Sequence, residues 1–153
     1  MYLYMWHGCG SHLLAYDAIK KLEKCPAAFL MGCDSGAYVL NGSYAPICTP
    51  TSYLCAGSSF VVANLWTVTS CYVDKTIRTM FTDMLKARSD WSSKGKELEH
   101  KNYKSTIGAM VSIARNSHAL LLGAGTVCFG LPTTICRKKN VASSNPNKRR
   151  KLY

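Results

Sequence analysis

The apolar residues near the start of the chain form two short continuous runs that are separated by a helical pattern. Residues 1–6 and 27–31 are entirely aromatic or aliphatic, and glycine-containing turns follow each run. Such runs predict strands that are buried on both faces, as in a parallel sheet. Residues 14–24 place Ile19 and Leu22 on one face and lysines on the other, which predicts an amphipathic helix. Together these segments predict a β-α-β unit with parallel strands and a right-handed crossover.

The rest of the chain continues to alternate between strand and helix patterns. A helix is predicted to begin at Thr49-Pro50 and to end at Gly57, because proline suits a first helical position and glycine a helix end. Further predicted elements are a strand at residues 60–66, helices at 72–88 and 105–116, an apolar segment at 120–122 and an edge strand at 126–129. Residues 38–50, up to the helix start, and 89–103 predict loops. This order of elements predicts an α/β fold.

Composition changes this picture only at the end of the chain. Hydrophobic residues make up 48% of the 153 residues, which is enough to build a folded core. The formal net charge is +11, but residues 137–153 hold seven of the 19 basic residues and no acid. Residues 1–136 therefore carry about +4, and this balance does not require a nucleic-acid-binding body. We predict one domain at residues 1–136, followed by a basic disordered tail at 137–153.

Eight cysteines are present, but their spacing does not favour a metal site. No pair has the C-x-x-C spacing typical of structural zinc, so we expect neither zinc nor another cofactor. The N-terminus lacks the pattern of a secretory signal, and free thiols in a reducing compartment are the simpler interpretation. No apolar run approaches the roughly 20 residues that a membrane-spanning helix needs, so no membrane association is expected.

Two residues with catalytic chemistry are predicted to end the first two strands. His7 follows residues 1–6, and Cys33 follows the second apolar run. In a β-α-β unit both carboxyl ends lie at the same sheet edge, and adjacent strands are about 4.8 Å apart. Ligands of open parallel sheets bind at that edge, so an imidazole and a thiol there form a candidate Cys–His pair. The alternative is structural, because a buried cysteine is more often a small core residue.

A set of sequence blocks matches the pattern of one protease family in order and spacing. Residues 7–11 read H-G-C-G-S, and residues 30–36 read L-M-G-C-D-S-G, close to L-M-G-C-S-S-G. Residues 49–58, 62–66 and 129–132 match T-P-x-S-Y-L-x-A-G-S, the start of A-N-L-W-D-V-T-D, and Y-G-[IVL]-P. The blocks span roughly residues 2–135 and resemble those of separases, the caspase-like endopeptidases that open cohesin rings.

The resemblance implies an N-terminally truncated, caspase-like three-layer sandwich of α/β type, with a mainly parallel sheet and helices on both faces. It implies a cysteine endopeptidase in which Cys33 attacks the scissile carbonyl and His7 is the acid/base. The backbone N–H groups of Gly8 and Cys33 are the implied oxyanion hole, and the other seven cysteines are interpreted as packing or incidental thiols. The positions implied for substrate contact are Asp34, Trp66 and Thr67.

The resemblance also implies partners and a biological role. The implied substrate is the kleisin subunit of cohesin, cut after an arginine to release sister chromatids at anaphase. A securin-like inhibitor is the implied binding partner. These expectations come from the family alone and not from composition, periodicity or spacing.

The chain departs from the family pattern on the substrate side. The block W-D-V-T-D is replaced by W-T-V-T-S at residues 66–70, so both acids are missing. The first acid is implied to pair with the arginine of the substrate, and Thr67 cannot supply that charge-assisted contact. Asp34 stands where the family has serine, and partial compensation is expected from this different turn. The family domain also has earlier strands, so residues 1–6 are expected to form an exposed apolar sheet edge.

Two other functions stay open at the level of sequence. One is a truncated or degenerate separase paralogue that binds without cleaving. The other is a basic nucleic-acid-binding module, which the tail favours although the body carries no known nucleic-acid-binding motif. The basic cluster at residues 148–151 also fits a nuclear-localisation signal or a merely solvated tail. We expect the protein in the nucleus and cytoplasm.

Overall fold

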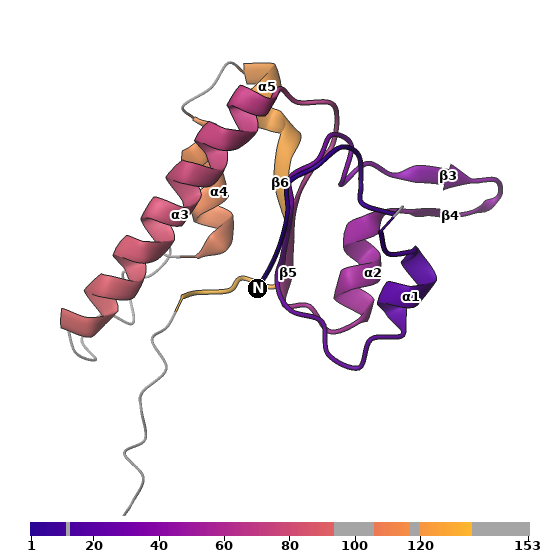
Figure 1. The fold of residues 1–153 in the computed structure, drawn as a ribbon, viewed down its shortest axis with the longest axis horizontal. Coiled ribbons are helices and arrows are strands. Elements are labelled where there is room, and N and C mark those ends of the chain that lie inside the picture. Colours follow the sequence, from indigo (N-terminus) through magenta and orange to yellow (C-terminus); the bar gives the residue numbers. More distant parts are fainter. Residues whose placement is uncertain (12, 94–105, 117–119, 136–153) are drawn as a thin grey trace, which may run out of the picture.

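The computed structural model describes residues 1–11, 13–93, 106–116 and 120–135. Strands and helices alternate along most of this chain, as Figure 1 shows. In chain order the elements are β1 (Tyr2–Tyr4), α1 (Tyr16–Lys20), β2 (Ala28–Leu30), β3 (Val39–Asn41), β4 (Tyr44–Ile47), α2 (Thr49–Cys55), β5 (Phe60–Asn64), α3 (Ser70–Ser93), α4 (Ile107–Arg115), α5 (Leu120–Gly125) and β6 (Thr126–Gly130). No helix in these ranges is long and apolar enough to span a bilayer.

The central sheet has the strand order β1-β2-β5-β6. β1, β2 and β5 run parallel, and their register aligns Leu3 with Phe29 and Phe29 with Val62. β6 runs antiparallel to β5 and pairs Asn64 with Thr126. The carboxyl ends of the three parallel strands therefore meet at one sheet edge, where the amino end of β6 also lies. The prediction of parallel strands in a β-α-β unit is confirmed.

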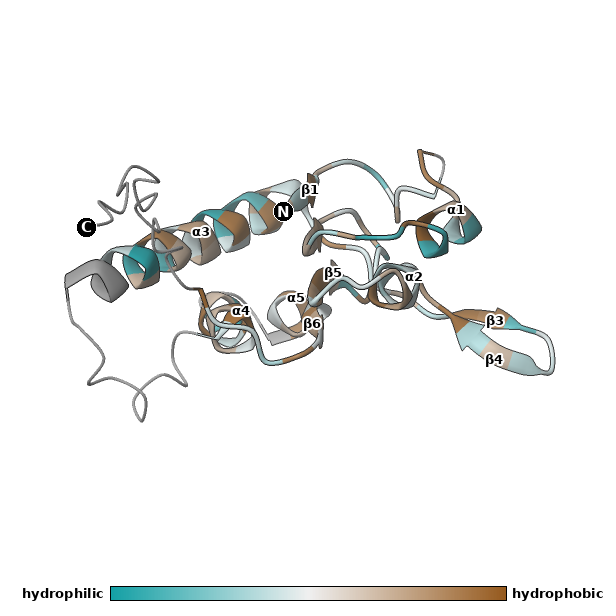
Figure 2. Cartoon of the chain, turned by 90° about the horizontal axis from the view of Figure 1, so that it is seen from below, coloured by the Kyte–Doolittle hydropathy of each residue, from teal (hydrophilic) through white to brown (hydrophobic). Residues whose placement is uncertain are grey.

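Helices cover both faces of this sheet, because alternate strand residues point to opposite sides. Phe29 and Val62 pack with α3 and α4 in one hydrophobic core, whereas Leu30 and Val61 pack with α1 and α2 in a second. Figure 1 shows the two helix pairs on opposite sides of the strands. The hydropathy colours of α3 alternate in Figure 2, as expected of a helix with one face in the core. The predicted three-layer α/β sandwich is confirmed.

The first helix is shorter than its sequence pattern predicts. Residues 14–24 predict a helix, but α1 covers only Tyr16–Lys20, and Leu22 is 42% exposed rather than packed inward. Two backbone contacts explain this difference. The Leu22 N–H donates to the Ile19 carbonyl and tightens the last turn, and the Cys25 N–H donates to the Ala56 carbonyl beyond α2. The chain is thereby pulled out of the helix toward α2.

A β-hairpin occupies the segment between the second strand and α2, where a loop was predicted. β3 and β4 pair antiparallel through a two-residue turn, in which Gly42 adopts a left-handed φ of 59°. Gly42-Ser43 is a Gly-Ser dipeptide, a hairpin-turn signal that the sequence interpretation did not weigh. The strands were difficult to predict because both are solvent-exposed and lack the alternation of apolar and polar residues. Pro46 also argues against a strand. Figure 1 shows the hairpin projecting away from the body.

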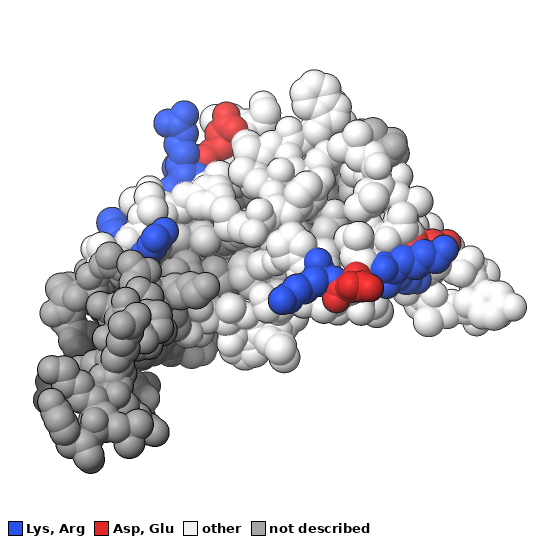
Figure 3. Space-filling model, turned by 60° about the horizontal axis from the view of Figure 1, so that its bottom comes forward, with Lys and Arg blue, Asp and Glu red and all other residues white. Residues whose placement is uncertain are grey.

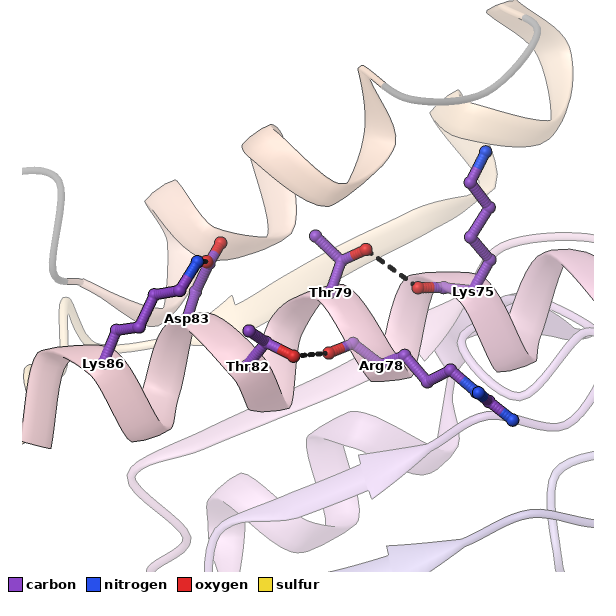
Figure 4. A network of polar contacts seen from close by, with 6 residues as sticks. All are labelled: Lys75, Arg78, Thr79, Thr82, Asp83 and Lys86. Carbon is purple, nitrogen blue, oxygen red and sulfur yellow. Dashed lines mark hydrogen bonds and ion pairs between the residues drawn. The ribbon is translucent and has the colours of Figure 1, made fainter.

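The long helix α3 confirms the predicted helix at residues 72–88 and extends beyond it. Residues 89–93 were predicted to be a loop, but the chain meets no glycine or proline before Gly95, so nothing stops the helix there. Residues 94–103 of that predicted loop lie outside the described residues. On the outward face, shown in Figure 4, the Thr79 and Thr82 hydroxyls donate to backbone carbonyls of their own helix, at 2.9 and 2.7 Å. An exposed ion pair joins Lys86 and Asp83 at 3.8 Å and contributes at most about 1 kcal/mol.

The last described elements agree with the sequence in position and differ in detail. α4 begins after Thr106, whose side chain accepts a hydrogen bond from the Ala109 N–H at 3.2 Å. The apolar segment at residues 120–122 belongs to a short helix, α5, and β6 is the edge strand that was predicted.

The short helix α2 starts at Thr49 rather than after it, and Gly57 follows its end with a φ of 88°. The tail at residues 137–153 lies outside the described residues.

Candidate active site

Three loops meet at the carboxyl edge of the parallel strands. His7 follows β1, Cys33 follows β2, and Trp66 and Thr67 follow β5. The first two loops are in direct contact at Gly32, where a Cβ atom would collide with the carbonyl oxygens of Gly8 and Trp6. The residue before the candidate nucleophile therefore has to be glycine, because any side chain would push the histidine loop away.

The Cys33 thiol and the His7 imidazole share this edge without a hydrogen bond between them in the described residues. Cys33 is half-buried, and its thiol donates to the Val68 carbonyl at 3.3 Å. His7 is exposed, and its ring lies edge-on to Trp6 with centroids 5.5 Å apart. The Tyr4 hydroxyl holds the His7 backbone by donating to its carbonyl at 2.6 Å. Pairing with the imidazole requires the thiol to leave the Val68 carbonyl, and their catalytic roles stay a prediction.

The turn that carries Cys33 is tied to the end of β5. Asp34 adopts a left-handed φ of 56°, and its N–H donates to the Trp66 carbonyl at 3.4 Å. The buried Ser35 hydroxyl donates to the Leu30 carbonyl at 2.5 Å and accepts from the Asn64 N–H at 3.0 Å. The Gly36 N–H donates to the Asn64 carbonyl at 2.8 Å. These contacts give the nucleophile turn a defined position relative to the neighbouring strand.

The two predicted oxyanion donors have backbone N–H groups without a partner among the described residues. Gly8 has a left-handed φ of 66°, which favours glycine, and a Cβ atom there would meet nothing within 4 Å. Backbone conformation, rather than crowding around the Cα atom, is therefore the reason for glycine at this position. Whether both N–H groups bind one oxyanion stays a prediction.

Asp34 and Thr67 come from different turns, and the structure brings their side chains together. The Thr67 hydroxyl donates to a carboxylate oxygen of Asp34 at 3.1 Å, and both residues are exposed. Within the described part of the chain, Asp34 forms no ion pair with a basic side chain. Trp66 is 38% exposed beside them. A carboxylate from the nucleophile turn thus lies within hydrogen-bond distance of the Thr67 side chain.

The cysteine next to the histidine has an environment that the sequence did not reveal. Burial raises the pKa of the Cys9 thiol, but hydrogen bonding to Ser11 and Tyr16 outweighs burial and lowers the pKa to about 7. Its sulfur lies 3.3 Å from the Ser11 hydroxyl and 3.6 Å from the Tyr16 hydroxyl. Cys9 is therefore not merely a packing thiol, and the signal was the hydroxyl-bearing residues two and seven positions later.

Cys25, Cys48 and Cys128 fit a packing role, whereas Cys55 and Cys71 are exposed. Burial raises the pKa of Cys25, and it raises the pKa of Cys128 to about 11. Cys48 is also buried, and all cysteines in the described ranges are free thiols. These same ranges hold no cluster of three or more His, Cys, Asp or Glu side chains suited to a metal ion. The described residues at this edge offer thiols, an imidazole, a carboxylate and backbone donors.

Comparisons with known proteins agree with this geometry. The family model for the separin protease domain matches residues 1–77. Separins of Emericella nidulans and Schizosaccharomyces pombe are 34% and 35% identical over alignments of 140 and 136 residues, and these alignments cover 86% and 88% of this chain. The chain spans only 6% and 7% of their lengths.

A solved structure is similar over the same region. The crystal structure of the Saccharomyces cerevisiae separase–securin complex at 2.6 Å resolution matches with a TM-score of 0.69 and 33% identity. The match covers 86% of this chain and 8% of that chain. Together with the three-layer sheet and the histidine and cysteine loops at its edge, these matches confirm the caspase-like α/β fold. The chain belongs to the separin protease-domain family.

Proposed function

We propose that the chain forms part of a separase-type cysteine endopeptidase with Cys33 as nucleophile and His7 as general acid/base. The observation that carries the proposal is the contact at Gly32, which joins the histidine loop and the nucleophile loop at one sheet edge. The family match over residues 1–77 includes both loops. The proposed reaction is hydrolysis of the cohesin kleisin subunit after an arginine.

In the proposed reaction His7 accepts the proton of the Cys33 thiol, and the thiolate sulfur attacks the scissile carbonyl carbon. The carbonyl electron pair moves onto oxygen, and the Gly8 and Cys33 N–H groups donate to that oxyanion. The carbonyl re-forms as the imidazolium protonates the departing amine, which leaves a thioester on Cys33. His7 then deprotonates a water molecule that attacks the thioester, and Cys33 is released as a thiol with the carboxylic acid product.

The arginine preference would rest on Asp34 in this chain. Its carboxylate is exposed, is adjacent to Cys33 in sequence and is held by the Thr67 hydroxyl. A guanidinium forms short, charge-assisted hydrogen bonds to such a carboxylate. The Asp34–Thr67 pair would thus replace the acid that the family places at the position of Thr67.

Covalent labelling tests the peptidase proposal directly. The chain is treated with a peptidyl acyloxymethyl ketone that carries arginine at P1, and modified cysteines are identified by mass spectrometry. We expect Cys33 to be modified in preference to the other cysteines, and His7→Ala to slow the reaction. Cys9→Ser is the matched control, because Cys9 has the lowered pKa that could cause unspecific labelling. Equal labelling of Cys33 and the other cysteines would refute the proposal.

A binding-only paralogue is the second candidate. It is favoured by the Cys33 thiol, which donates to Val68 rather than to His7, and by the missing acids at residues 67 and 70. Since the matched yeast structure is a complex with securin, a securin-like inhibitor is the proposed partner in either case. Binding of such an inhibitor without labelling of Cys33 would select the binding-only function.

Nucleic-acid binding receives less support from the face of the molecule that Figure 3 draws. Figure 3 shows basic and acidic side chains beside one another at the margins of a broad uncharged face. A continuous basic stripe is the usual footprint of a nucleic-acid interface. Residence in the nucleus and cytoplasm stays a proposal that rests on the basic cluster at residues 148–151.

A further inference from the structure

A buried chain of polar side chains connects α3 with the nucleophile turn. The Tyr72 hydroxyl lies 2.8 Å from the Thr126 hydroxyl, which donates to the Asn64 side-chain carbonyl at 2.6 Å. The Asn64 side-chain amide donates to the Gly32 carbonyl at 3.2 Å. Asn64 and Thr126 are 0% exposed and Tyr72 is 2% exposed. Water does not compete for these groups, so each hydrogen bond is maintained by the fold.

The direction of these hydrogen bonds is determined by the number of protons available. The single hydroxyl proton of Thr126 is donated to Asn64, so Tyr72 is the donor in its 2.8 Å contact with Thr126, which is shorter than the 3.5 Å contact of the same hydroxyl with the Gly123 carbonyl. Because the Asn64 oxygen is occupied by Thr126, its NH₂ group faces the Gly32 carbonyl. Asn64 and Thr126 are directly opposed on β5 and β6, which keeps their side chains in register. Every donor in the chain therefore points toward the nucleophile turn.

The last hydrogen bond of this side-chain network is made to the peptide group that contains the Cys33 N–H. The Gly32 carbonyl and the Cys33 N–H belong to one planar peptide group, and there are no cis peptide bonds in the described chain. In a trans peptide group the C=O and N–H bonds point in opposite directions. Fixing the Gly32 oxygen on Asn64 therefore fixes the direction in which the Cys33 N–H points.

We propose that the Tyr72–Thr126–Asn64 chain positions the Cys33 N–H as an oxyanion donor. This inference rests on the proposed peptidase function, in which that N–H binds the developing oxyanion. Asn64 is a positioning residue and not a catalytic residue, because it contacts the backbone of the nucleophile turn and not the substrate. A merely structural network would satisfy buried polar groups without affecting the Cys33 N–H.

Substitution of Thr126 tests the proposal in the 153-residue chain. Thr126→Val keeps the size of the side chain and removes the hydroxyl that holds Asn64, whereas Thr126→Ser retains the hydroxyl. The first readout is the Cys33 amide resonance in chain labelled with ¹⁵N-cysteine, assigned by its loss in Cys33→Ser. We expect this resonance to shift in Thr126→Val and to keep the wild-type position in Thr126→Ser.

The second readout separates the oxyanion donor from thiol reactivity. A peptidyl aldehyde with arginine at P1 forms a hemithioacetal whose oxygen needs the oxyanion donors, whereas alkylation by iodoacetamide does not. Loss of one such donor typically weakens transition-state binding by about a hundredfold or more. We expect Thr126→Val to bind the aldehyde at least about tenfold more weakly, with an unchanged rate of Cys33 alkylation, and Thr126→Ser to restore affinity.

The outcomes distinguish this inference from the proposed function. An unmoved Cys33 amide resonance in Thr126→Val overturns the positioning role, and so do equal aldehyde affinities of the two variants where the wild-type chain binds the aldehyde. If the wild-type chain does not bind the aldehyde but the amide shifts only in Thr126→Val, the positioning role stands and the peptidase proposal fails. If Thr126→Val does not fold, Tyr72→Phe is used instead, because it removes the first donor of the side-chain network. The amide resonance and the aldehyde affinity of that variant then decide whether the network positions the Cys33 N–H.

Discussion

At the residue scale, the two candidate catalytic side chains are held to different degrees. The Cys33 thiol donates to Val68, and its turn is bonded to β5 through Asp34, Ser35 and Gly36. Within the described residues, His7 is held through its backbone carbonyl and by the edge-on contact of its ring with Trp6, and its imidazole is exposed. The histidine is thus the more adjustable partner, and formation of the dyad depends on release of the thiol from Val68. Catalytic hydrogen bonds often tighten only when substrate binds.

Asp34 provides the first prediction at this scale. Asp34→Asn keeps the shape of the side chain and removes the charge that would bind a P1 arginine. A hydrogen bond to a charged group contributes about 1.5–3 kcal/mol, so kcat/KM on an arginine peptide should fall about ten- to hundredfold. Thr67→Asp in the same variant returns a carboxylate to this site and should recover part of the activity.

A peptide with citrulline at P1 is the control, since it keeps the shape of arginine without the charge. Asp34→Asn should change hydrolysis of this peptide little. The same kcat/KM for Asp34→Asn and wild type on the arginine peptide would exclude Asp34 from recognition of the substrate.

Cys9 provides a prediction of pH dependence. Hydrogen bonds lower its pKa to about 7, so its thiolate is the main form above pH 7 and is lost below it. Because folding lowers this pKa, the thiolate stabilises the fold above the pKa of the unfolded thiol, and that contribution disappears as pH falls through about 7. We expect Cys9 alkylation to rise with pH with a midpoint near 7, as followed by peptide mass spectrometry.

Tyr16→Phe removes one of the hydrogen bonds to Cys9 and should move this midpoint upward. Cys128 is the internal control, because burial raises its pKa to about 11 and should keep it unlabelled at neutral pH. A midpoint at the ordinary thiol pKa of about 8.5 would mean that Ser11 and Tyr16 do not stabilise the thiolate.

At the scale of elements, the close approach of two loops depends on a single glycine. Gly32→Ala would place a methyl group against the Gly8 and Trp6 carbonyls, and such overpacking costs about 1–3 kcal/mol. We expect a lower melting temperature and loss of Cys33 labelling by the arginine warhead, because the histidine loop must move away. Gly108→Ala in α4 is the matched control, since nothing lies within 4 Å of its Cβ position.

Gly108→Ala should be as stable as wild type or more so, because alanine in a helix is about 0.5–1 kcal/mol more favourable than glycine. Unchanged labelling in Gly32→Ala would show that the loop contact is not required for the active site. Comparison of the two variants thus separates the need for glycine at the loop contact from the helix propensity of alanine.

At the scale of the whole molecule, apolar side chains remain exposed along β1, the outermost strand of the sheet. β1 pairs only with β2 in the described chain, and Met1 and Trp6, which lie just before and after the strand, are 67% and 68% exposed. An edge strand with apolar side chains is a template for pairing with another strand. The 153-residue chain is therefore expected to self-associate as its concentration rises, as measured by light scattering.

Leu3→Lys places a charge in the middle of β1 and should reduce this association. Leu40→Lys is the control, because Leu40 is 82% exposed on the projecting hairpin and away from the edge strand. A monomer at all concentrations, or an equal effect of the two lysines, would contradict association through β1.

The sequence predicted the sheet better than the surface elements. Continuous apolar runs such as residues 27–31 and 60–63 are explained by burial on both faces, and they correspond to β2 and β5. The hairpin at β3 and β4 was missed, because its residues pack against little and carry no periodic pattern. The shortened α1 was missed because a hydrogen bond from Cys25 to Ala56, distant in sequence, ends it.

The sequence by itself determined at which strand ends the candidate catalytic residues lie. His7 and Cys33 could be placed at one sheet edge because parallel topology brings the carboxyl ends of strands together. The tertiary structure alone decided the contacts between turns that are distant in sequence. The Thr67 hydroxyl meets Asp34, the Cys33 thiol meets Val68, and Asn64 holds the Gly32 carbonyl. Such contacts depend on turn conformation and side-chain packing between loops, which no local pattern of residues encodes.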